Sequence, residues 1–185
     1  MHRNLITNLL NDYFPGNVEE QANKTRMLDF LATEPSCFER ACQSGHFTAS
    51  CWLENFYGNA ALLTHHKKFN GWLQLGGHAD GDNDLLRVAI KEAEEESGLS
   101  VEPVSDKIFD LGVHFIPYEG ATQHYHYDVR FYLRATEDKS FTVSEESHDL
   151  MWVERDNQLP DNVDVKRMFL KWKQLKSFLW AGIGA

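Results

Sequence analysis

The stretch from residue 77 to residue 99, GHADGDNDLLRVAIKEAEEESGL, decides how this chain folds. Its apolar residues recur at helical spacing and predict one helix face that docks on a core: Leu85, Leu86, Ala89, Ile90 and Ala93. Asp82 and Asn83 are suited to cap the start of this helix, and Gly98 supplies the left-handed residue that ends it. The sequence therefore predicts a helix from about residue 84 to residue 97.

Three glutamates occupy one patch of the predicted helix. Glu92, Glu95 and Glu96 stand at positions i, i+3 and i+4, so their side chains converge instead of circling the axis. Ionised neighbours of this kind repel one another. The cluster is tolerable if water solvates it, and useful if it holds a hard divalent cation, because Mg²⁺ and Mn²⁺ prefer carboxylate, carbonyl and water ligands.

In its spacing, this stretch resembles the signature of the Nudix hydrolases, Gly-x5-Glu-x7-Arg-Glu-U-x-Glu-Glu-x-Gly-U, where U is aliphatic. Both glycines and all three glutamates are in register. Two positions depart: Asn83 stands where the family has Glu, and Lys91 where it has Arg. Lysine keeps the positive charge but lacks the planar fork of arginine, which predicts a slower enzyme, not an inactive one. Asn83 is as readily interpreted as a helix cap as a residue near the metal.

The resemblance implies a divalent-metal-dependent diphosphohydrolase. Its substrate would be a nucleoside diphosphate linked to another group X, and an activated water would cleave the P–O–P bond with Mg²⁺ or Mn²⁺ as cofactor. A second hypothesis is a catalytically weak module of the same fold that senses a ligand or binds a protein. A third is an unrelated domain whose acidic helix face is simply solvated.

The resemblance also assigns roles to single residues. Glu95 and Glu96 are the expected direct metal ligands, Glu92 a ligand or the general base, and Lys91 the residue that orients a glutamate. The Gly76 carbonyl is expected to complete the metal shell, because glycine lets the backbone approach a ligand closely.

One further acidic residue is expected from a later loop. Family members often carry an additional catalytic or metal-binding glutamate about six residues before a late tryptophan. Glu146 lies six residues before Trp152, and Glu145 is the adjacent alternative. For both, an exposed acidic turn is an equally good interpretation.

Candidates for substrate binding are basic or polar side chains outside the helix. The segment His65-His66-Lys67-Lys68 precedes the signature, and His78 follows its double glycine. On the strand that starts at residue 124, alternation places four polar residues on one face: His124, His126, Asp128 and Arg130. His65, Lys67, His78, His124, His126 and Arg130 are therefore the predicted substrate-binding residues, although a solvated strand end or an open sheet face would explain them equally.

The order of predicted elements favours an α/β fold, a Nudix-type α/β/α sandwich around a mixed β-sheet, with an N-terminal helical extension. Residues 1–45 form the predicted extension. Its first helix ends at Pro15-Gly16, a second opens at Asn17 with a capping box to Glu20, and a short third helix follows Pro35. The extension is expected to pack on the main domain, and it is also a candidate for the substrate entrance or a homodimer contact.

Residues 46–185 form the predicted Nudix hydrolase domain. A hairpin is expected from residues 46–56 and 60–66, because Tyr57-Gly58-Asn59 between them favours a turn. Further strands are expected at residues 69–75, 107–117, 124–135 and 150–154, and an amphipathic helix at residues 163–179.

Composition limits the partners. With 28 acidic and 18 basic residues the net charge is −10, which opposes binding to nucleic acid or to an anionic membrane, so a small-molecule phosphoanhydride is the expected partner. Neither a signal peptide nor an apolar run of membrane-spanning length stands out, which predicts a cytoplasmic protein. The three cysteines, Cys37, Cys42 and Cys51, are interpreted as reduced thiols, in preference to a zinc site shared with His46.

Overall fold

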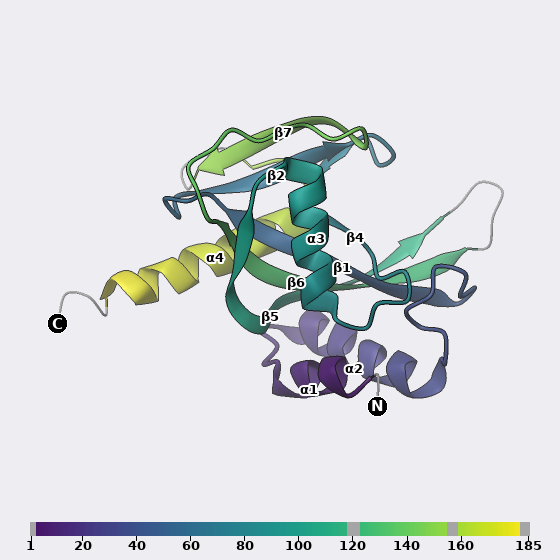
Figure 1. Ribbon diagram of the computed structural model, residues 1–185. Helices are drawn as coiled ribbons and strands as arrows, with labels where there is room; N and C mark the ends of the chain where they lie inside the picture. The colour runs from purple at the N-terminus through teal and green to yellow at the C-terminus, as the bar shows by residue number, and fades with distance from the viewer. Residues whose placement is uncertain (1–2, 118–122, 155–158, 182–185) are drawn as a thin grey trace.

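A seven-stranded mixed sheet carries helices on both of its faces (Figure 1). The computed structural model describes residues 3–117, 123–154 and 159–181, except for the side chains of residues 178–181. The elements follow in the order α1 (Asn4–Asp12), α2 (Val18–Thr33), β1 (Gly45–Glu54), β2 (Ala60–His66), β3 (Gly71–Leu73), β4 (Leu75–His78), α3 (Leu85–Ser97), β5 (Val101–Ile116), β6 (His124–Ala135), β7 (Ser147–Glu154) and α4 (Val163–Ala181). The predicted α/β fold is confirmed.

Strand β1 is the centre of the sheet. It pairs in parallel with β6 along ten residues, from Gly45 opposite Tyr125 to Glu54 opposite Arg134. The predicted hairpin with β2 is present but pairs only at Leu53 with Leu62 and at Glu54 with Ala61, because β4 occupies the edge of β1 farther along. The rest of β2 pairs with β3 and β7 instead. The sheet therefore divides between β1 and β2, near the point where β4 leads into α3.

Two hydrophobic cores lie on opposite faces of this sheet. The larger one joins α1, α2 and α3 to the inward side chains of β1 and β6, such as Phe47 and Phe131. The smaller one packs α4 against the other face, with Trp172 and Trp52 completely buried. Figure 1 shows α3 crossing one face of the sheet and α4 lying behind it.

The N-terminal helices contribute to the larger core. Ile6, Leu10 and Met27 have no exposed surface, and the ring of Phe30 stacks on Tyr127 with 4.1 Å between ring centres. The capping box is confirmed: the Asn17 side chain accepts a hydrogen bond from the Glu20 N–H at 2.9 Å.

Three local predictions are wrong. Residues 69–75 do not form a single strand, because β3 ends at Leu73 and β4 begins at Leu75 with a different partner. No third helix follows Pro35: residues 35–44 form turns, held by bonds such as Glu39 N–H to Ser36 O at 2.8 Å, and the Cys37 carbonyl already accepts from Phe47 at the start of β1. The cap of α3 is Asp84, whose side chain accepts from the Arg87 N–H, and not Asp82 or Asn83. Asp82 pairs instead with the Arg87 side chain.

Candidate active site at the glycine turn and the acidic helix

The double glycine of β4 lets α3 lie against the sheet. Gly76 has a φ of +154°, and a side chain there would overlap Ser50 of the neighbouring strand β1. A Cβ on Gly77 would overlap the Glu92 carboxylate. The two glycines are therefore what bring the backbone of β4 close to the carboxylates of the helix.

Glu96 is the most deeply buried of the three signature glutamates. Only 5% of its surface is exposed, and its carboxylate accepts a hydrogen bond from the Gly76 N–H at 3.3 Å. Burial, together with the negative charges of Glu92 and Glu146, raises the pKa of Glu96 to about 8 against the opposing effect of the Gly76 hydrogen bond. A buried carboxylate with so little compensation is suited to hold a cation.

Lys91 lies between the other two glutamates. Its Nζ is 3.2 Å from Glu92 Oε1 and 3.1 Å from Glu95 Oε2. Glu92 is largely buried, and this burial raises its pKa, whereas Glu95 is exposed. The lysine thus holds the two carboxylates in fixed relation at the rim of the cluster.

Glu146 approaches the cluster from the loop before β7. The Glu146 carbonyl accepts from the Lys67 N–H at 3.0 Å, and Lys67 Nζ donates to the Glu145 carbonyl at 2.6 Å. These bonds anchor the loop at the end of β2. The negative charge of Glu146 contributes to the raised pKa values of both Glu92 and Glu96, after burial as the main cause.

The structure divides the six predicted substrate-binding residues among three places. His65 stacks on Trp72 at one end of β2, with 5.1 Å between ring centres, and Lys67 is exposed just beyond it. His78, His124 and His126 gather in a group with His46. Arg130 lies apart from both, inside the protein.

Arg130 has no exposed surface and is surrounded by three aspartates. Its guanidinium contacts Asp110 at 2.8 Å, Asp128 at 2.7 Å and Asp164 at 3.0 Å. These partners come from β5, β6 and α4, so the arginine ties the helix to the sheet. Because three aspartates already bind this guanidinium, it is placed to hold the sheet face in shape more than to bind a ligand directly.

Sequence reasoning missed the second polar row that completes this sheet face. On β1, Thr48 and Ser50 donate hydrogen bonds to the Asp128 carboxylate, at 3.0 and 2.5 Å, and Gln74 donates to it at 3.2 Å. The signal was the alternation of His46, Thr48 and Ser50 along β1, which matches the polar row of β6.

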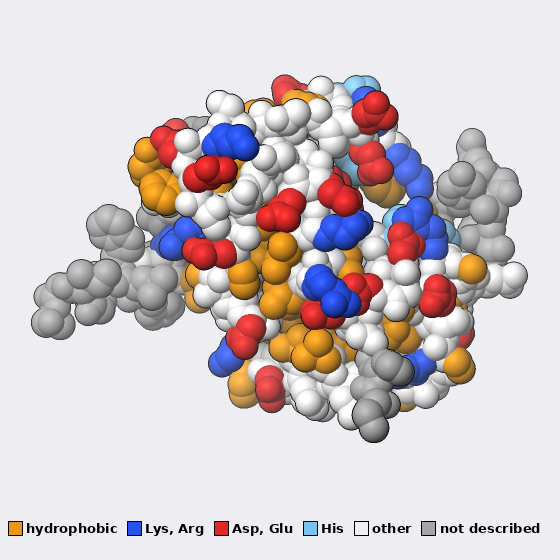
Figure 2. Space-filling view, in the orientation of Figure 1, with side chains coloured by type: hydrophobic (Ala, Val, Ile, Leu, Met, Phe, Trp, Pro, Cys, Tyr) orange, Lys and Arg blue, Asp and Glu red, His pale blue; other side chains and the backbone are white. Residues whose placement is uncertain are grey.

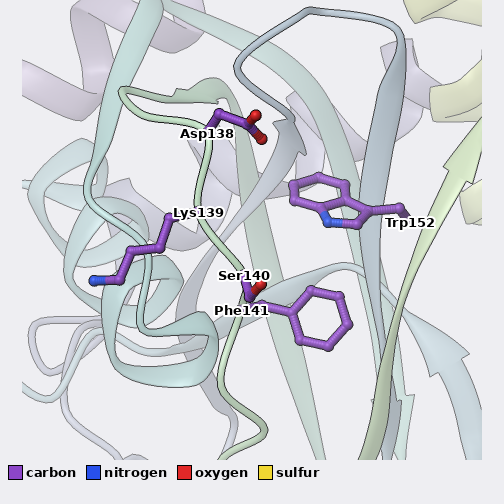
Figure 3. A pocket seen from close by; sticks show the side chains of 5 residues that line it. All are labelled: Asp138, Lys139, Ser140, Phe141 and Trp152. Atoms are coloured by element: carbon purple, nitrogen blue, oxygen red, sulfur yellow. The ribbon is translucent and has the colours of Figure 1, made fainter.

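A cavity of about 480 Å³ lies near the far end of α3 (Figure 3). Five residues line it: Asp138, Lys139, Ser140, Phe141 and Trp152. The same segment is fastened to the helix by the Thr142 N–H, which donates to the Ser97 carbonyl at 2.7 Å. None of the signature glutamates lines this cavity.

The surrounding surface is of mixed charge. Figure 2 shows acidic and basic side chains interspersed over the face that carries α3. Within the part of the chain that the structure describes, no helix is long and apolar enough to cross a membrane.

Comparison with known proteins identifies the domain. The family model of the NUDIX domain matches residues 45–173. Similar solved structures include a Caenorhabditis elegans Ap4A hydrolase in a binary complex (16% identity, TM-score 0.57, covering 71% of this chain and 97% of that one). A NUDIX-family hydrolase from Clostridium perfringens is also similar (24% identity, TM-score 0.53, 70% and 97%), as is a UDP-X diphosphatase (14% identity, TM-score 0.54, 91% and 90%). No curated protein shows significant sequence similarity to the chain.

Proposed function

The chain belongs to the Nudix family of hydrolases, enzymes that act on phosphoanhydride bonds of small molecules, and from this premise we propose that it is a divalent-metal-dependent diphosphohydrolase of nucleoside diphosphates linked to a group X. The observation that carries the proposal is the buried carboxylate of Glu96. It faces Glu92 and Glu146, and the one hydrogen bond that the structure gives it comes from Gly76.

The residues present fit a hard divalent cation. The cluster offers carboxylate oxygens from α3 and from the loop before β7, beside the backbone of Gly76. Mg²⁺ and Mn²⁺ favour such oxygen donors. A cation would also relieve the repulsion and the burial that raise the pKa of Glu96 to about 8. Glu95, Glu96 and the Gly76 carbonyl are the proposed ligands, and Glu92 and Glu146 are each proposed as a further ligand or as the general base.

The residues of the chain take different roles in the proposed reaction. When bound, the cation neutralises phosphate oxygens and lowers the pKa of the attacking water. Glu92 or Glu146 accepts the proton of that water, since both carboxylates lie beside Glu96. Lys91 positions Glu92 and Glu95 through the contacts at 3.2 and 3.1 Å. The point charge of lysine orients them less rigidly than an arginine fork, so we expect a modest rate.

Substrate binding is proposed for the polar groups around the cluster. His78 follows the double glycine directly, His65 and Lys67 flank the loop that carries Glu146, and His124 and His126 lie on the polar sheet face. Arg130 is proposed to hold that face in shape through its aspartates. The cytoplasmic location and a homodimer are proposed only from composition and from the helical extension.

A substrate screen with and without metal tests the proposal. The panel contains nucleoside triphosphates, dinucleoside polyphosphates, nucleotide sugars including UDP-linked ones, ADP-ribose and dinucleotide cofactors. We expect phosphate-containing products from at least one of them with Mg²⁺ or Mn²⁺, and none after chelation. Turnover that persists after chelation contradicts the metal mechanism. Binding without turnover in saturating metal would favour the ligand-sensing alternative, to which the Asn83 and Lys91 departures point.

Paired substitutions test the assignment of residues. We expect Glu96→Gln to reduce turnover by about a hundredfold or more and to diminish the stabilisation that metal binding gives the fold. Glu94→Gln is the matched control, because Glu94 is an exposed glutamate of the same helix turn. Equal losses in the two variants would show that the proposed register of the helix is wrong.

A further inference from the structure

Four histidines from three strands meet on the sheet face that carries α4. His46 lies on β1, His78 on β4, and His124 and His126 on β6. The strand register explains the meeting: His46 stands directly opposite His126, and β4 places His78 opposite Thr48, two residues along β1 from His46. None of these side chains belongs to the carboxylate cluster.

His46 is a buried side chain whose two ring nitrogens lack hydrogen-bond partners within the described residues. Only 2% of its surface is exposed. Burying a polar atom without a partner is unfavourable, and a bound metal ion would supply such a partner. A neutral imidazole keeps one nitrogen lone pair for that ligand.

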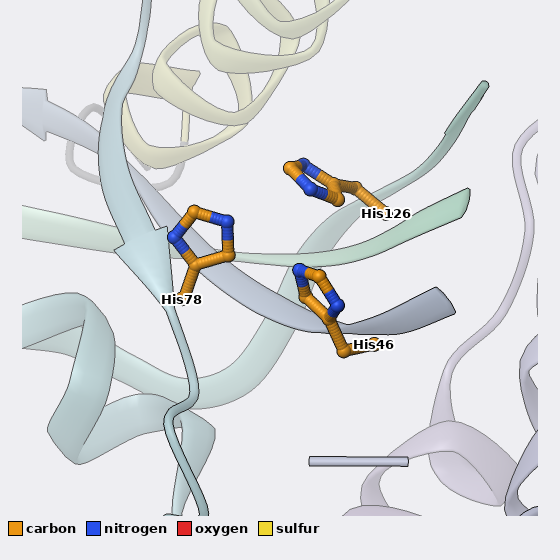
Figure 4. A group of neighbouring side chains, drawn as sticks. All are labelled: His46, His78 and His126. Atoms are coloured by element: carbon orange, nitrogen blue, oxygen red, sulfur yellow. The ribbon is translucent and has the colours of Figure 1, made fainter. Parts of the chain in front are cut away.

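The three rings converge on one space. The donor nitrogens of His46, His78 and His126 all lie within 4.8 Å of one another, and binding to one tetrahedral ion would draw them to about 3.4 Å. Imidazoles bound to one tetrahedral ion through nitrogens about 2.1 Å from it have ring centres roughly 5 Å apart. The ring centre of His46 lies 5.0 Å from that of His78 and 4.8 Å from that of His126, and the latter two are 5.0 Å apart. Figure 4 shows the three rings grouped around a common space.

His124 adjoins the same group. Its ring centre is 5.0 Å from that of His46 and 5.1 Å from that of His126. The Nε2 atoms of His124 and His126 are 3.1 Å apart, a separation at which a proton or a metal ion is shared. His124 is thus placed to become a fourth ligand after a small rotation of its ring.

We propose that His46, His78 and His126, with His124 as the fourth member, form a second metal site that takes a borderline transition-metal ion such as Zn²⁺. Nitrogen donors favour this class over Mg²⁺, whose preferred ligands are oxygens. The neighbouring carboxylate of Asp80 is engaged by Arg40 at 2.8 and 2.7 Å, which leaves the histidines as the donors. The ion would bind His46 and so satisfy one of its two buried nitrogens.

Such an ion would fasten three strands beside the candidate active site. His78 is the residue after Gly77, whose backbone lies against Glu92. An ion held by His46, His78 and His126 would fix the end of β4 to β1 and β6. The proposed role is to hold the strand that carries the double glycine, and metal binding tests the site without reference to the proposed hydrolase activity.

Titration of the full-length protein with Zn²⁺ in excess Mg²⁺ tests the site, with Co²⁺ as a coloured probe. We expect one tightly bound equivalent of Zn²⁺ and visible Co²⁺ absorption typical of tetrahedral nitrogen ligation. His46→Asn, His78→Asn and His126→Asn should each weaken Zn²⁺ binding at least about tenfold. His148→Asn is the matched control, because His148 is an exposed histidine on β7 outside the group, and it should bind as the wild type does.

A double variant separates this site from the carboxylates. Glu92→Gln combined with Glu96→Gln should keep the tight equivalent of Zn²⁺, even where it abolishes turnover. His78 is partly exposed, so His78→Asn serves as the decisive variant if substitution of the buried His46 prevents folding. Absence of a tight equivalent in the wild type overturns the proposal. Unchanged Zn²⁺ affinity and Co²⁺ absorption in a folded His78→Asn protein, or loss of the equivalent in the glutamate double variant, overturns it as well.

Discussion

In the metal-free protein, burial destabilises the ionised form of the Glu96 carboxylate. Burial raises its pKa from 4.5 to about 8, so between these values the folded state holds a proton that the unfolded chain has released. The stability that this proton brings is complete below pH 4.5 and is lost as the pH rises through 8. His46, His78 and His126 act in the opposite direction, because burial lowers their pKa values and the neutral rings lose stability as the pH falls below 6.5.

Between pH 6.5 and pH 8, the pH dependence of the free energy of unfolding therefore reports on Glu96 and not on the histidines. In this window we expect the free energy of unfolding of the metal-free protein to fall, by at most about 1.4 kcal/mol per pH unit. Urea denaturation in a chelator at several pH values measures it. Glu96→Gln should remove the slope, and a slope that survives the substitution would show that another group causes it.

Gly77 gives a second prediction for a single residue. A methyl group there would overlap the Glu92 carboxylate, which can swing away because it ends a flexible side chain. We expect Gly77→Ala to keep the fold but to lower turnover about tenfold or more, because displaced catalytic groups lose their alignment. Gly71→Ala is the control, since its Cβ would find only the Phe69 carbonyl at 3.7 Å. Steady-state kinetics and a thermal melt of both variants decide the matter, and equal turnover in the two would contradict the proposed position of Glu92.

Among the elements, β6 depends for its stability on the buried charge of Arg130. Arg130 is completely buried with three aspartates, so removing it takes the cation away from the buried Asp128 and leaves Asp110 and Asp164 to Arg167 and Lys171. We expect Arg130→Met to lower the free energy of unfolding by about 3–5 kcal/mol. Arg87→Gln breaks an exposed pair with Asp82 and should cost about 1 kcal/mol or less. Urea unfolding compares the two, and similar losses would refute the structural importance of the Arg130 network.

For the whole molecule, the N-terminal helices and the sheet share one core. Ile6, Leu10 and Met27 are completely buried in it, and Glu20 pairs with Lys171 of α4 at 2.9 Å. We expect deletion of residues 1–44 to expose this apolar surface and to abolish cooperative unfolding, because the remaining sheet face loses its cover. Thermal unfolding and size-exclusion chromatography of the truncated protein measure this. A monomeric, cooperatively unfolding fragment would show instead that residues 45–185 fold alone.

The local features of the fold could be predicted from the amino-acid sequence. The register of glycines and glutamates from residue 77 to residue 99 identified the family, the alternation of residues 124–135 set the bounds of β6, and Asn17 with Glu20 set the start of α2. These patterns are legible because helix and strand periods and caps involve neighbours within a few residues. The turns after Pro35 escaped prediction, because the strand that follows captures the Cys37 carbonyl.

Which polar residues come into contact depends on the packing of strands and helices. The parallel pairing of β1 with β6 brings His46 beside His124 and His126, and the packing of α4 brings Asp164 to Arg130. In the sequence, His126 and Arg130 belong to one alternating row, yet the fold gives them different surroundings. Strand partners and helix packing join residues tens of positions apart, and no local period encodes that choice.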